Sequence, residues 1–347
     1  MKDLKELTRN ELIEDLKKAG FPAYRGEQVF NWLYKNGISK TEEMKNIPKK
    51  MRSYLDNNYN LNNLKESKRS VAVDGTVKYL WQLNDGENIE GVYLPFPESG
   101  RHSACISTQV GCGLGCSFCA TGIDGLKRNL TTGEIVEQVL EIQKDISGSN
   151  FAEPRLSNLV FMGMGEPLAN FDNLMQAVEI LNSNQGLNIG MRKMTISTAG
   201  LVPEIKKLAK VNDQIGLAIS LHAPNDRLRN KIMPINKKYN INQLLKTVID
   251  YIEKTGRRVT FEYVLMDSVN DSPELSVQLS ELLRGINCHV NLIPANPVPE
   301  LGIERPVQKV IDSFYDTLVN NGIQVSLRKE MGSQIEAACG QLKRKEK

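Results

Sequence analysis

Three cysteines, Cys112, Cys116 and Cys119, lie close together between Gly111 and Gly122. Their C-x3-C-x2-C spacing offers three thiolates, whereas a closed zinc site or a closed iron–sulfur cluster takes four protein ligands. Three thiolates can hold three corners of a cubane iron–sulfur cluster and leave the fourth iron open for a small ligand. Because no fourth Cys or His lies nearby at metal-ligand spacing, we favour such a cluster over a zinc knuckle or free thiols.

This spacing is that of the radical S-adenosylmethionine (SAM) enzymes, and the cysteine segment resembles that superfamily. The resemblance implies a 4Fe–4S cluster held by the three cysteines, with SAM on the open iron. Glycines between the first two cysteines and just before them let the backbone wrap tightly around a bulky inorganic group.

A second candidate segment is Gly163-Met-Gly165-Glu166. Its glycines allow the backbone to approach a ligand closely, and Glu166 supplies a carboxylate for an ammonium group. The third glycine of a dinucleotide-binding G-x-G-x-x-G is missing, so a simple turn is the competing interpretation. Next to the cysteine segment, we favour binding of the SAM amino group by Gly165 and Glu166.

Further polar residues follow other predicted strands. We expect Ser197 and Asn296 to hold the carboxylate and the ribose or adenine of SAM, although each alone is more often a capping or turn residue. In Ser220-Leu221-His222 we expect SAM contacts through backbone or side chain. A lone His after a strand is more often structural, so that alternative stays open.

The elements that must position these residues form a repeating pattern from about residue 103 onward. Strands are predicted over 104–108, 158–162, 193–197, 216–221, 259–265 and 289–293, with a last strand over 324–327. Helices are predicted over 132–146, 173–182, 203–210, 241–254, 273–284 and 306–320. The predicted fold is therefore α/β, a partial (βα)6 TIM-like barrel of the radical SAM type with its site at the carboxyl ends of the strands. A doubly wound sheet fits the alternation nearly as well.

The residues before this repeat differ in pattern. Thr8 and Glu11 form a predicted capping box that opens an amphipathic helix, and we assign 1–65 to a small N-terminal helical accessory domain that binds RNA or simply packs as a cap. In residues 66–100, hydrophobic residues alternate with others on both sides of the turn signal Asn84-Asp-Gly86. These residues are predicted to form a β-hairpin linker. Residues 101–347 then form the barrel and a C-terminal cysteine segment.

Bulk composition fits an intracellular enzyme. The hydrophobic content of 40%, the charged content of 24% and the acidic, polar first residues predict a soluble cytoplasmic protein without a signal peptide or membrane span. Six cysteines, three in one short segment, suit metal chemistry in a reducing compartment. A net charge of +3 permits nucleic-acid binding without requiring it.

Three other cysteines and one carboxylate are ambiguous from the residues alone. Cys339 has small neighbours that suit a reactive thiol, but a near-terminal Cys is more often inert. Cys105 could be buried on the first barrel strand or could face Cys339, and Cys288 is interpreted as a core residue. Glu90 does not stand out by pattern.

Several further segments resemble one family, the RlmN-type radical SAM methyltransferases that act on carbon 2 of adenine in rRNA and tRNA. The resemblance covers nearly the whole chain. The matching segments are Gln109-Val-Gly-Cys112, Cys116-Ser-Phe-Cys-Ala-Thr-Gly122, Arg128-Asn-Leu-Thr131, Phe161-Met-Gly-Met-Gly-Glu-Pro-Leu168, Ile219-Ser-Leu-His-Ala-Pro224, Met233-Pro-Ile-Asn236 and Ala337-Ala-Cys-Gly-Gln-Leu342.

The resemblance implies roles that spacing does not supply. Cys339 matches the cysteine that a first SAM methylates, and a second SAM gives the 5′-deoxyadenosyl radical that activates this methyl group. Glu90 matches the proton acceptor, and Cys105 matches the cysteine that forms a disulfide with Cys339. The implied substrates are an adenosine in the peptidyl-transferase region of 23S rRNA and the adenosine 3′ of the anticodon in tRNA.

The implied electron donor is a protein such as flavodoxin or ferredoxin, and we expect a monomer. The nearest alternative is the related adenine carbon-8 methyltransferase of 23S rRNA that confers antibiotic resistance. A radical SAM enzyme with another substrate is a second alternative. A non-enzymatic RNA-binding protein with a structural metal is the alternative of a different class.

Overall fold

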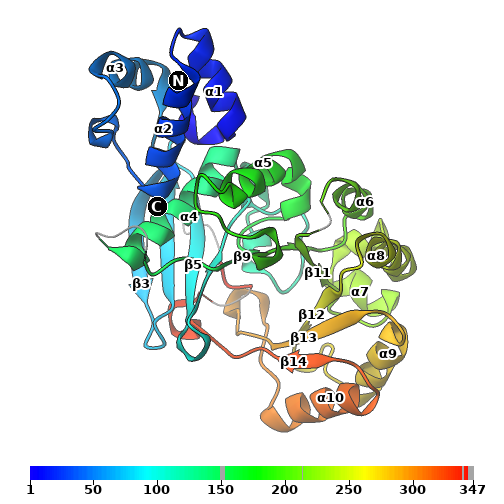
Figure 1. Ribbon diagram of the computed structural model, residues 1–347. Coiled ribbons are helices and arrows are strands. Elements are labelled where there is room, and N and C mark those ends of the chain that lie inside the picture. Colours follow the sequence, from blue (N-terminus) through cyan, green and yellow to red (C-terminus); the bar gives the residue numbers. More distant parts are fainter. Residues whose placement is uncertain (149–152, 213, 338–339, 343–347) are drawn as a thin grey trace.

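A computed structural model describes residues 1–148, 153–212, 214–337 and 340–342. Within these residues, ten strands form one sheet in the order β14-β13-β12-β11-β10-β9-β6-β5-β4-β3 (Figure 1). The two edge strands, β14 and β3, do not pair with each other among the described residues. The sheet is therefore open, as expected for a partial barrel.

Seven strands of this sheet are parallel and alternate with helices along the chain. The strands are β6 (Arg101–Cys105), β9 (Asn158–Phe161), β10 (Met194–Thr198), β11 (Gly216–Ser220), β12 (Val259–Leu265), β13 (Cys288–Pro294) and β14 (Val325–Leu327). The helices are α4 (Thr132–Ser147), α5 (Phe171–Asn182), α6 (Val202–Val211), α7 (Asp226–Ile232), α8 (Ile241–Thr255), α9 (Pro273–Leu283) and α10 (Gln308–Asn320). Each strand and helix predicted from the repeat is present, although β6 lies three residues earlier than the predicted 104–108. Helix α7 was not predicted.

The two faces of the parallel strands differ in burial. On β10, Met194, Ile196 and Thr198 are buried, whereas Thr195 and Ser197 between them are only partly buried. Met194 and Ile196 pack in the main hydrophobic core, and Thr195 lines the cavity that contains Cys105, called the principal cavity below. Figure 1 shows the helices along the outer side of these strands. A doubly wound sheet would need helices on both faces, so the barrel alternative is the correct one.

Three antiparallel strands extend the sheet on the other side of β6. They are β3 (Leu64–Val71), β4 (Val77–Leu83) and β5 (Asn88–Phe96). The predicted hairpin is confirmed as the β4–β5 pair, with its turn at the Asn84-Asp-Gly86 signal. Strand β3 was not predicted, because its sequence LKESKRSV is mostly exposed and polar, as suits the edge of a sheet.

The N-terminal residues form helices α1 (Arg9–Lys18), α2 (Ala23–Lys35) and α3 (Lys49–Asn58) and a two-stranded pair of β1 (Lys2–Asp3) and β2 (Tyr59–Asn60). The predicted capping box of α1 is confirmed: the Glu11 amide donates to Thr8 Oγ1, and the Thr8 amide donates to the Glu11 carboxylate at 2.9 Å. None of the described helices is long and apolar enough to cross a membrane.

Short 3₁₀ turns complete the described structure. They span Leu4–Glu6, Thr41–Glu43, Pro97–Ser99, Ala120–Gly122, Pro167–Asn170, Met191–Lys193, Pro234–Lys237, Pro299–Leu301 and Ser333–Ile335.

Buried polar contacts join the N-terminal residues to helix α4 of the barrel. Lys5 Nζ lies 3.1 Å from Glu137 Oε1, and both side chains are almost fully buried. The Asn63 amide donates to the other oxygen of the same carboxylate at 2.8 Å. Burial raises the pKa of Glu137, and Lys5 opposes this shift. The ion pair therefore fixes the helical region against the barrel.

Replacing Lys5 with Met should leave Glu137 buried without its cation. We expect Lys5→Met to lower the free energy of unfolding by about 3–5 kcal/mol, because removing one partner of a buried pair leaves an uncompensated charge. The control is Lys17→Met, which breaks the exposed pair with Glu14 and should cost less than about 1 kcal/mol. Denaturant unfolding measures both, and equal losses would contradict a special role for the Lys5 pair.

Candidate active site

A short antiparallel ribbon frames the cysteine loop. It consists of β7 (Gln109–Gly111) and β8 (Leu126–Asn129), neither of which was predicted. The Cys112 amide donates to the Gly125 carbonyl at 3.2 Å. Gly111 has a φ of 74°, and a Cβ added there would lie 2.0 Å from that same carbonyl oxygen. Glycine is therefore required where the ribbon passes into the loop.

The three loop cysteines interact electrostatically with one another. Burial raises the pKa of the Cys112 thiol to about 11, and the neighbouring Cys119 contributes to this rise. Burial and the other two thiols raise the pKa of Cys116 further. Three thiolates in this space need a strong positive charge to remain ionised, which a bound metal centre provides.

The donor set fits a cubane cluster better than a single ion. Among the described residues, no three His, Cys, Asp or Glu side chains lie close enough together to hold one metal ion. Three thiolates match three corners of a cubane cluster, whereas a closed tetrahedral zinc site takes four protein ligands. The thiols of Cys112, Cys116 and Cys119 could therefore hold a 4Fe–4S cluster.

Two distant segments hold the cysteine loop in place. The Ser117 amide donates to the carbonyl of Ile232, the last residue of α7, at 3.0 Å. The Ala120 amide donates to the Gly340 carbonyl at 2.9 Å, and Thr121 Oγ1 donates to the Leu342 carbonyl at 2.6 Å. The loop thus contacts the residues that follow Cys339 in the sequence. Cys339 itself lies outside the described residues.

The Gly163–Glu166 segment packs directly against the chain that leads into the cysteine loop. A Cβ at Gly163 would lie 2.6 Å from Ser107 Oγ, and one at Gly165 would lie 2.5 Å from Gln109 Cβ. Gly165 also has a φ of 100°. The Gln109 amide donates to the Met164 carbonyl at 3.2 Å. These glycines are required for close packing of the backbone.

Glu166 is buried at the end of β9 and bridges to the end of β10. Its two carboxylate oxygens accept hydrogen bonds from the amides of Ala199 at 2.7 Å and Leu168 at 3.0 Å. Burial raises the pKa of Glu166 to about 7, although these hydrogen bonds oppose the shift. A carboxylate has about four lone-pair sites, so Glu166 can accept a further donor such as an ammonium group.

His222 follows β11 and lies against the cysteine loop. Its ring is buried and packs edge-on against Phe118, with centroids 4.8 Å apart. Nδ1 accepts a hydrogen bond from the Val264 amide at 3.0 Å, which assigns the proton of the neutral ring to Nε2. Burial lowers the pKa of His222 to about 3, so the ring is neutral at physiological pH. Its Nε2–H is a hydrogen-bond donor beside the loop.

Arg229, on α7, is the main residue that the sequence analysis missed. It is fully buried, and its guanidinium donates to the carbonyls of Ala199 at 2.7 Å, Ser220 at 3.0 Å and Leu221 at 3.1 Å. Burial lowers its pKa to about 10, so it remains a cation. In the sequence it stands between exposed basic residues, and only its spacing to the apolar Ile232 indicated a buried helix face.

The other predicted SAM-contact residues lie at the same end of the sheet. Ser197 on β10 and Ser220 on β11 are both partly buried. Leu221 is fully buried, and its amide donates to the Glu262 carbonyl at 3.1 Å. Its carbonyl accepts the hydrogen bond from Arg229, so both of its main-chain polar groups have partners. Asn296 follows β13 and lines the principal cavity.

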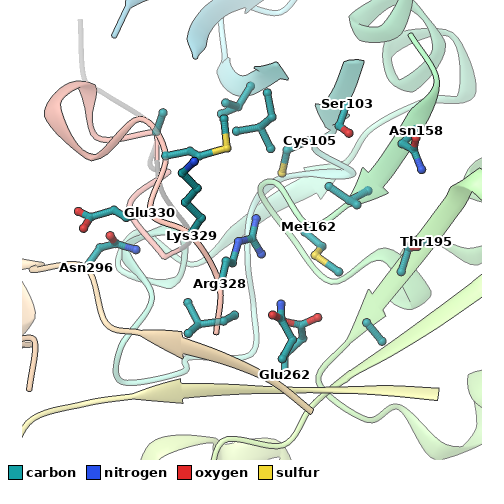
Figure 2. A pocket seen from close by; sticks show the side chains of 18 of the residues that line it. Ser103, Cys105, Asn158, Met162, Thr195, Glu262, Asn296, Arg328, Lys329 and Glu330 are labelled. Carbon is teal, nitrogen blue, oxygen red and sulfur yellow. The ribbon is translucent and has the colours of Figure 1, made fainter. Parts of the chain in front are cut away.

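This cavity, of about 480 Å³, occupies the interior of the open barrel. Figure 2 shows Cys105, Met162, Glu262 and Arg328 pointing into it from different walls. Burial raises the pKa of Glu262, and the nearby Arg328 opposes this shift. The cavity therefore brings a thiol, a carboxylate and a guanidinium to one interior space.

The C-terminal segment closes one side of the cavity. Ala337 and Leu342, on either side of the undescribed pair 338–339, both line the cavity that contains Cys105. Glu90 is buried on β5, and its carboxylate lies 3.3 Å from Lys78 Nζ. Sequence analysis named Glu90 only through the family resemblance and did not name Lys78.

Comparisons with known proteins agree with this geometry. Residues 106–279 match the Radical SAM superfamily, and residues 2–61 match the Ribosomal RNA large subunit methyltransferase N-terminal domain. A probable dual-specificity RNA methyltransferase RlmN of Alkaliphilus oremlandii is 48% identical over 99% of this chain and 98% of the relative. Another, of Bacillus cytotoxicus, is 47% identical over 98% of this chain and 93% of the relative. The crystal structure of a radical SAM methyltransferase from Sphaerobacter thermophilus has a TM-score of 0.94 and 45% identity over 99% of both chains.

The fold and the cysteine loop therefore define a radical SAM enzyme. The near full-length identity goes further: the chain belongs to the dual-specificity RNA methyltransferase RlmN family, and it is a radical SAM RNA methyltransferase.

Removing the guanidinium of Arg229 should destabilise the strand ends. We expect Arg229→Met to lower the free energy of unfolding by at least about 3 kcal/mol, because three buried carbonyl groups lose a donor at about 1–3 kcal/mol each. Arg227→Met, in the same helix but exposed, should change stability by about 0.5 kcal/mol or less. Denaturant unfolding of both variants checks this, and a small loss at Arg229 would refute the assigned role.

Proposed function

We propose that this enzyme forms 2-methyladenosine in the peptidyl-transferase region of 23S rRNA and at the adenosine 3′ of the anticodon in tRNA. The one-carbon group would pass through a methylated Cys339. Membership of the RlmN family supports this assignment. The N-terminal match to an rRNA methyltransferase domain is consistent with an RNA substrate.

One observation carries the proposal. The residues flanking the pair 338–339 contact both parts of the site, because Gly340 accepts a hydrogen bond from the cysteine loop and Ala337 lines the cavity that contains Cys105. A C-terminal thiol that serves as a methyl carrier must reach both the SAM site and the second thiol. A terminal segment held between the loop and the cavity suits this function.

The cofactors are assigned to the residues already described. Cys112, Cys116 and Cys119 would hold the 4Fe–4S cluster, which together with SAM supplies the 5′-deoxyadenosyl radical. The residues that would contact SAM are Gly165, Glu166, Ser197, Ser220, Leu221, His222 and Asn296. Glu166 is the natural partner for the ammonium group, because burial without a cation raises its pKa.

Three residues would carry the methyl transfer itself. Cys339 would be methylated by a first SAM, and its methyl group would give a hydrogen atom to the 5′-deoxyadenosyl radical from a second SAM before the remaining methylene carbon bonds to carbon 2 of adenine. Glu90 would accept the proton that carbon 2 loses, and the single electron left on the adduct would return to the redox system that supplies the cluster. Cys105 would then form a disulfide with Cys339, so that the methylene carbon keeps the electron pair of the broken C–S bond and takes up a proton.

The target base must leave its stack to reach an interior cavity, as base-modifying enzymes generally require. RNA recognition would therefore use shape, phosphates and a splayed base. We further propose a cytoplasmic monomer that receives electrons from a flavodoxin or ferredoxin.

The decisive test uses full-length protein reconstituted with iron and sulfide under anaerobic conditions. Incubation with SAM, a reductant and a 23S rRNA fragment should give 2-methyladenosine, detected by mass spectrometry of nucleosides. Cys339→Ala should abolish the product because the methyl carrier is lost. Cys288→Ala is the control, since this cysteine lies at the start of β13, and it should retain activity.

The other outcomes are equally informative. An 8-methyladenosine product would assign the enzyme to the antibiotic-resistance branch. Full activity of Cys339→Ala would refute the carrier role. SAM cleavage without any methylated adenosine, with tRNA as well as rRNA, would refute the proposed substrates.

A further inference from the structure

We propose that Lys78 is a positioning residue that keeps Glu90 ionised beside the C-terminal segment. The inference rests on the proposed function, in which Glu90 accepts the proton from carbon 2 of adenine. Lys78 lies on β4 and was not among the residues expected to act in the site.

The first contact of Lys78 is with Glu90. Lys78 Nζ lies 3.3 Å from Glu90 Oε1, and the two side chains are only 7% and 1% exposed. A carboxylate this deeply buried is costly to ionise unless a cation accompanies it, and otherwise it takes up a proton. A protonated carboxyl group cannot accept the proton that the reaction must remove. Lys78 therefore supplies the charge that Glu90 needs to act as a base.

The second contact of Lys78 is with the C-terminal segment. Nζ donates to the main-chain carbonyl of Glu336 at 3.1 Å. Four residues earlier in the chain, the Gly332 amide donates to the Asp74 carboxylate at 2.9 Å, in the turn between β3 and β4. The segment that leads to Cys339 is thus attached to the β3–β4 hairpin at two points. One ammonium group joins this segment to the proposed base.

The sheet register places Lys78 on the same face as Cys105. Lys78 pairs with Val92, and Val92 pairs with Cys105, so the three residues form one row across β4, β5 and β6. Paired residues point to the same face of a sheet. Glu90 lies two residues along β5 from Val92 and shares that face. The base and the second thiol therefore lie on the same face of the sheet, on adjacent strands.

A cavity of about 300 Å³ lies beside the ion pair. It is lined by Lys68, Ser70, Lys78, Leu80, Glu90, Gln334, Ile335 and Glu336. Glu90 is therefore one of the residues around a space between the sheet and the C-terminal segment. A base that receives a proton from a bound nucleotide needs such a space beside it.

The test separates the early steps from the late one. With wild-type and Lys78→Met enzymes we would measure 5′-deoxyadenosine, methylation of Cys339 by intact-protein mass, the covalent protein–RNA adduct on denaturing gels, and 2-methyladenosine. Lys78→Met should form 5′-deoxyadenosine and methylated Cys339 normally. Its 2-methyladenosine rate should fall at least about a hundredfold, the lower end of what a general base contributes, while the adduct accumulates.

Three further variants identify the cause of the defect. Glu90→Gln should show the same late defect, and the double variant should be no slower than Glu90→Gln alone, because both changes remove one function. Lys78→Arg keeps the charge and should recover much of the rate. Lys65→Met removes an exposed lysine of β3 that does not line this cavity and should behave as wild type.

The outcomes distinguish a failure of the proposed function from a failure of the inference about Lys78. A wild-type enzyme that forms no 2-methyladenosine would overturn the proposed function and this inference together. An active wild type with an equally active Lys78→Met would overturn the inference alone. The same is true if Lys78→Met loses Cys339 methylation as well, if its defect adds to that of Glu90→Gln, or if Lys65→Met is equally impaired.

Discussion

The buried guanidinium of Arg229 is the interaction on which the site depends. Parallel strands end with carbonyl groups that have no further strand partner, and at β10 and β11 these groups lie in the interior. Arg229 satisfies them from a short helix outside the sheet. The last residue of that helix then binds the cysteine loop through the Ile232 carbonyl. The strand ends, the helix and the loop are therefore one connected polar structure, and a cation lies near Cys116 within it.

Most of the barrel could be predicted because strands and helices alternate with clear periodicity. Residues 259–265, for example, form a strand with the predicted bounds. The elements that were missed share a physical cause. Strand β3 is polar because it is an edge, β7 and β8 are short segments fixed by a bend around the loop, and α7 is short with one deeply buried polar residue. Their conformations depend on tertiary contacts that local periodicity does not record.

Some residues of the candidate site could likewise be predicted from the sequence and others could not. The cysteine spacing and the Gly163–Glu166 segment were evident because their residue types and intervals are themselves the chemical requirement. Glu90 could be named only by family resemblance, since a carboxylate on a hairpin face is normally solvated. Lys78 gave no usable signal and Arg229 gave only its spacing to Ile232, because a buried cation is recognised by the partners that folding brings to it. The Lys78 contact with Glu336 spans 258 residues.

The open barrel is closed by a segment that is not a strand. After β14 the chain leaves one edge of the sheet and crosses to the β3–β4 hairpin at the opposite edge, where Asp74 and Lys78 bind it (Figure 1). The same segment also contributes Ala337 and Leu342 to the main hydrophobic core. The first and last parts of the sheet are therefore joined through the side chains of Asp74 and Lys78, where a closed barrel would use a ladder of main-chain hydrogen bonds between strands.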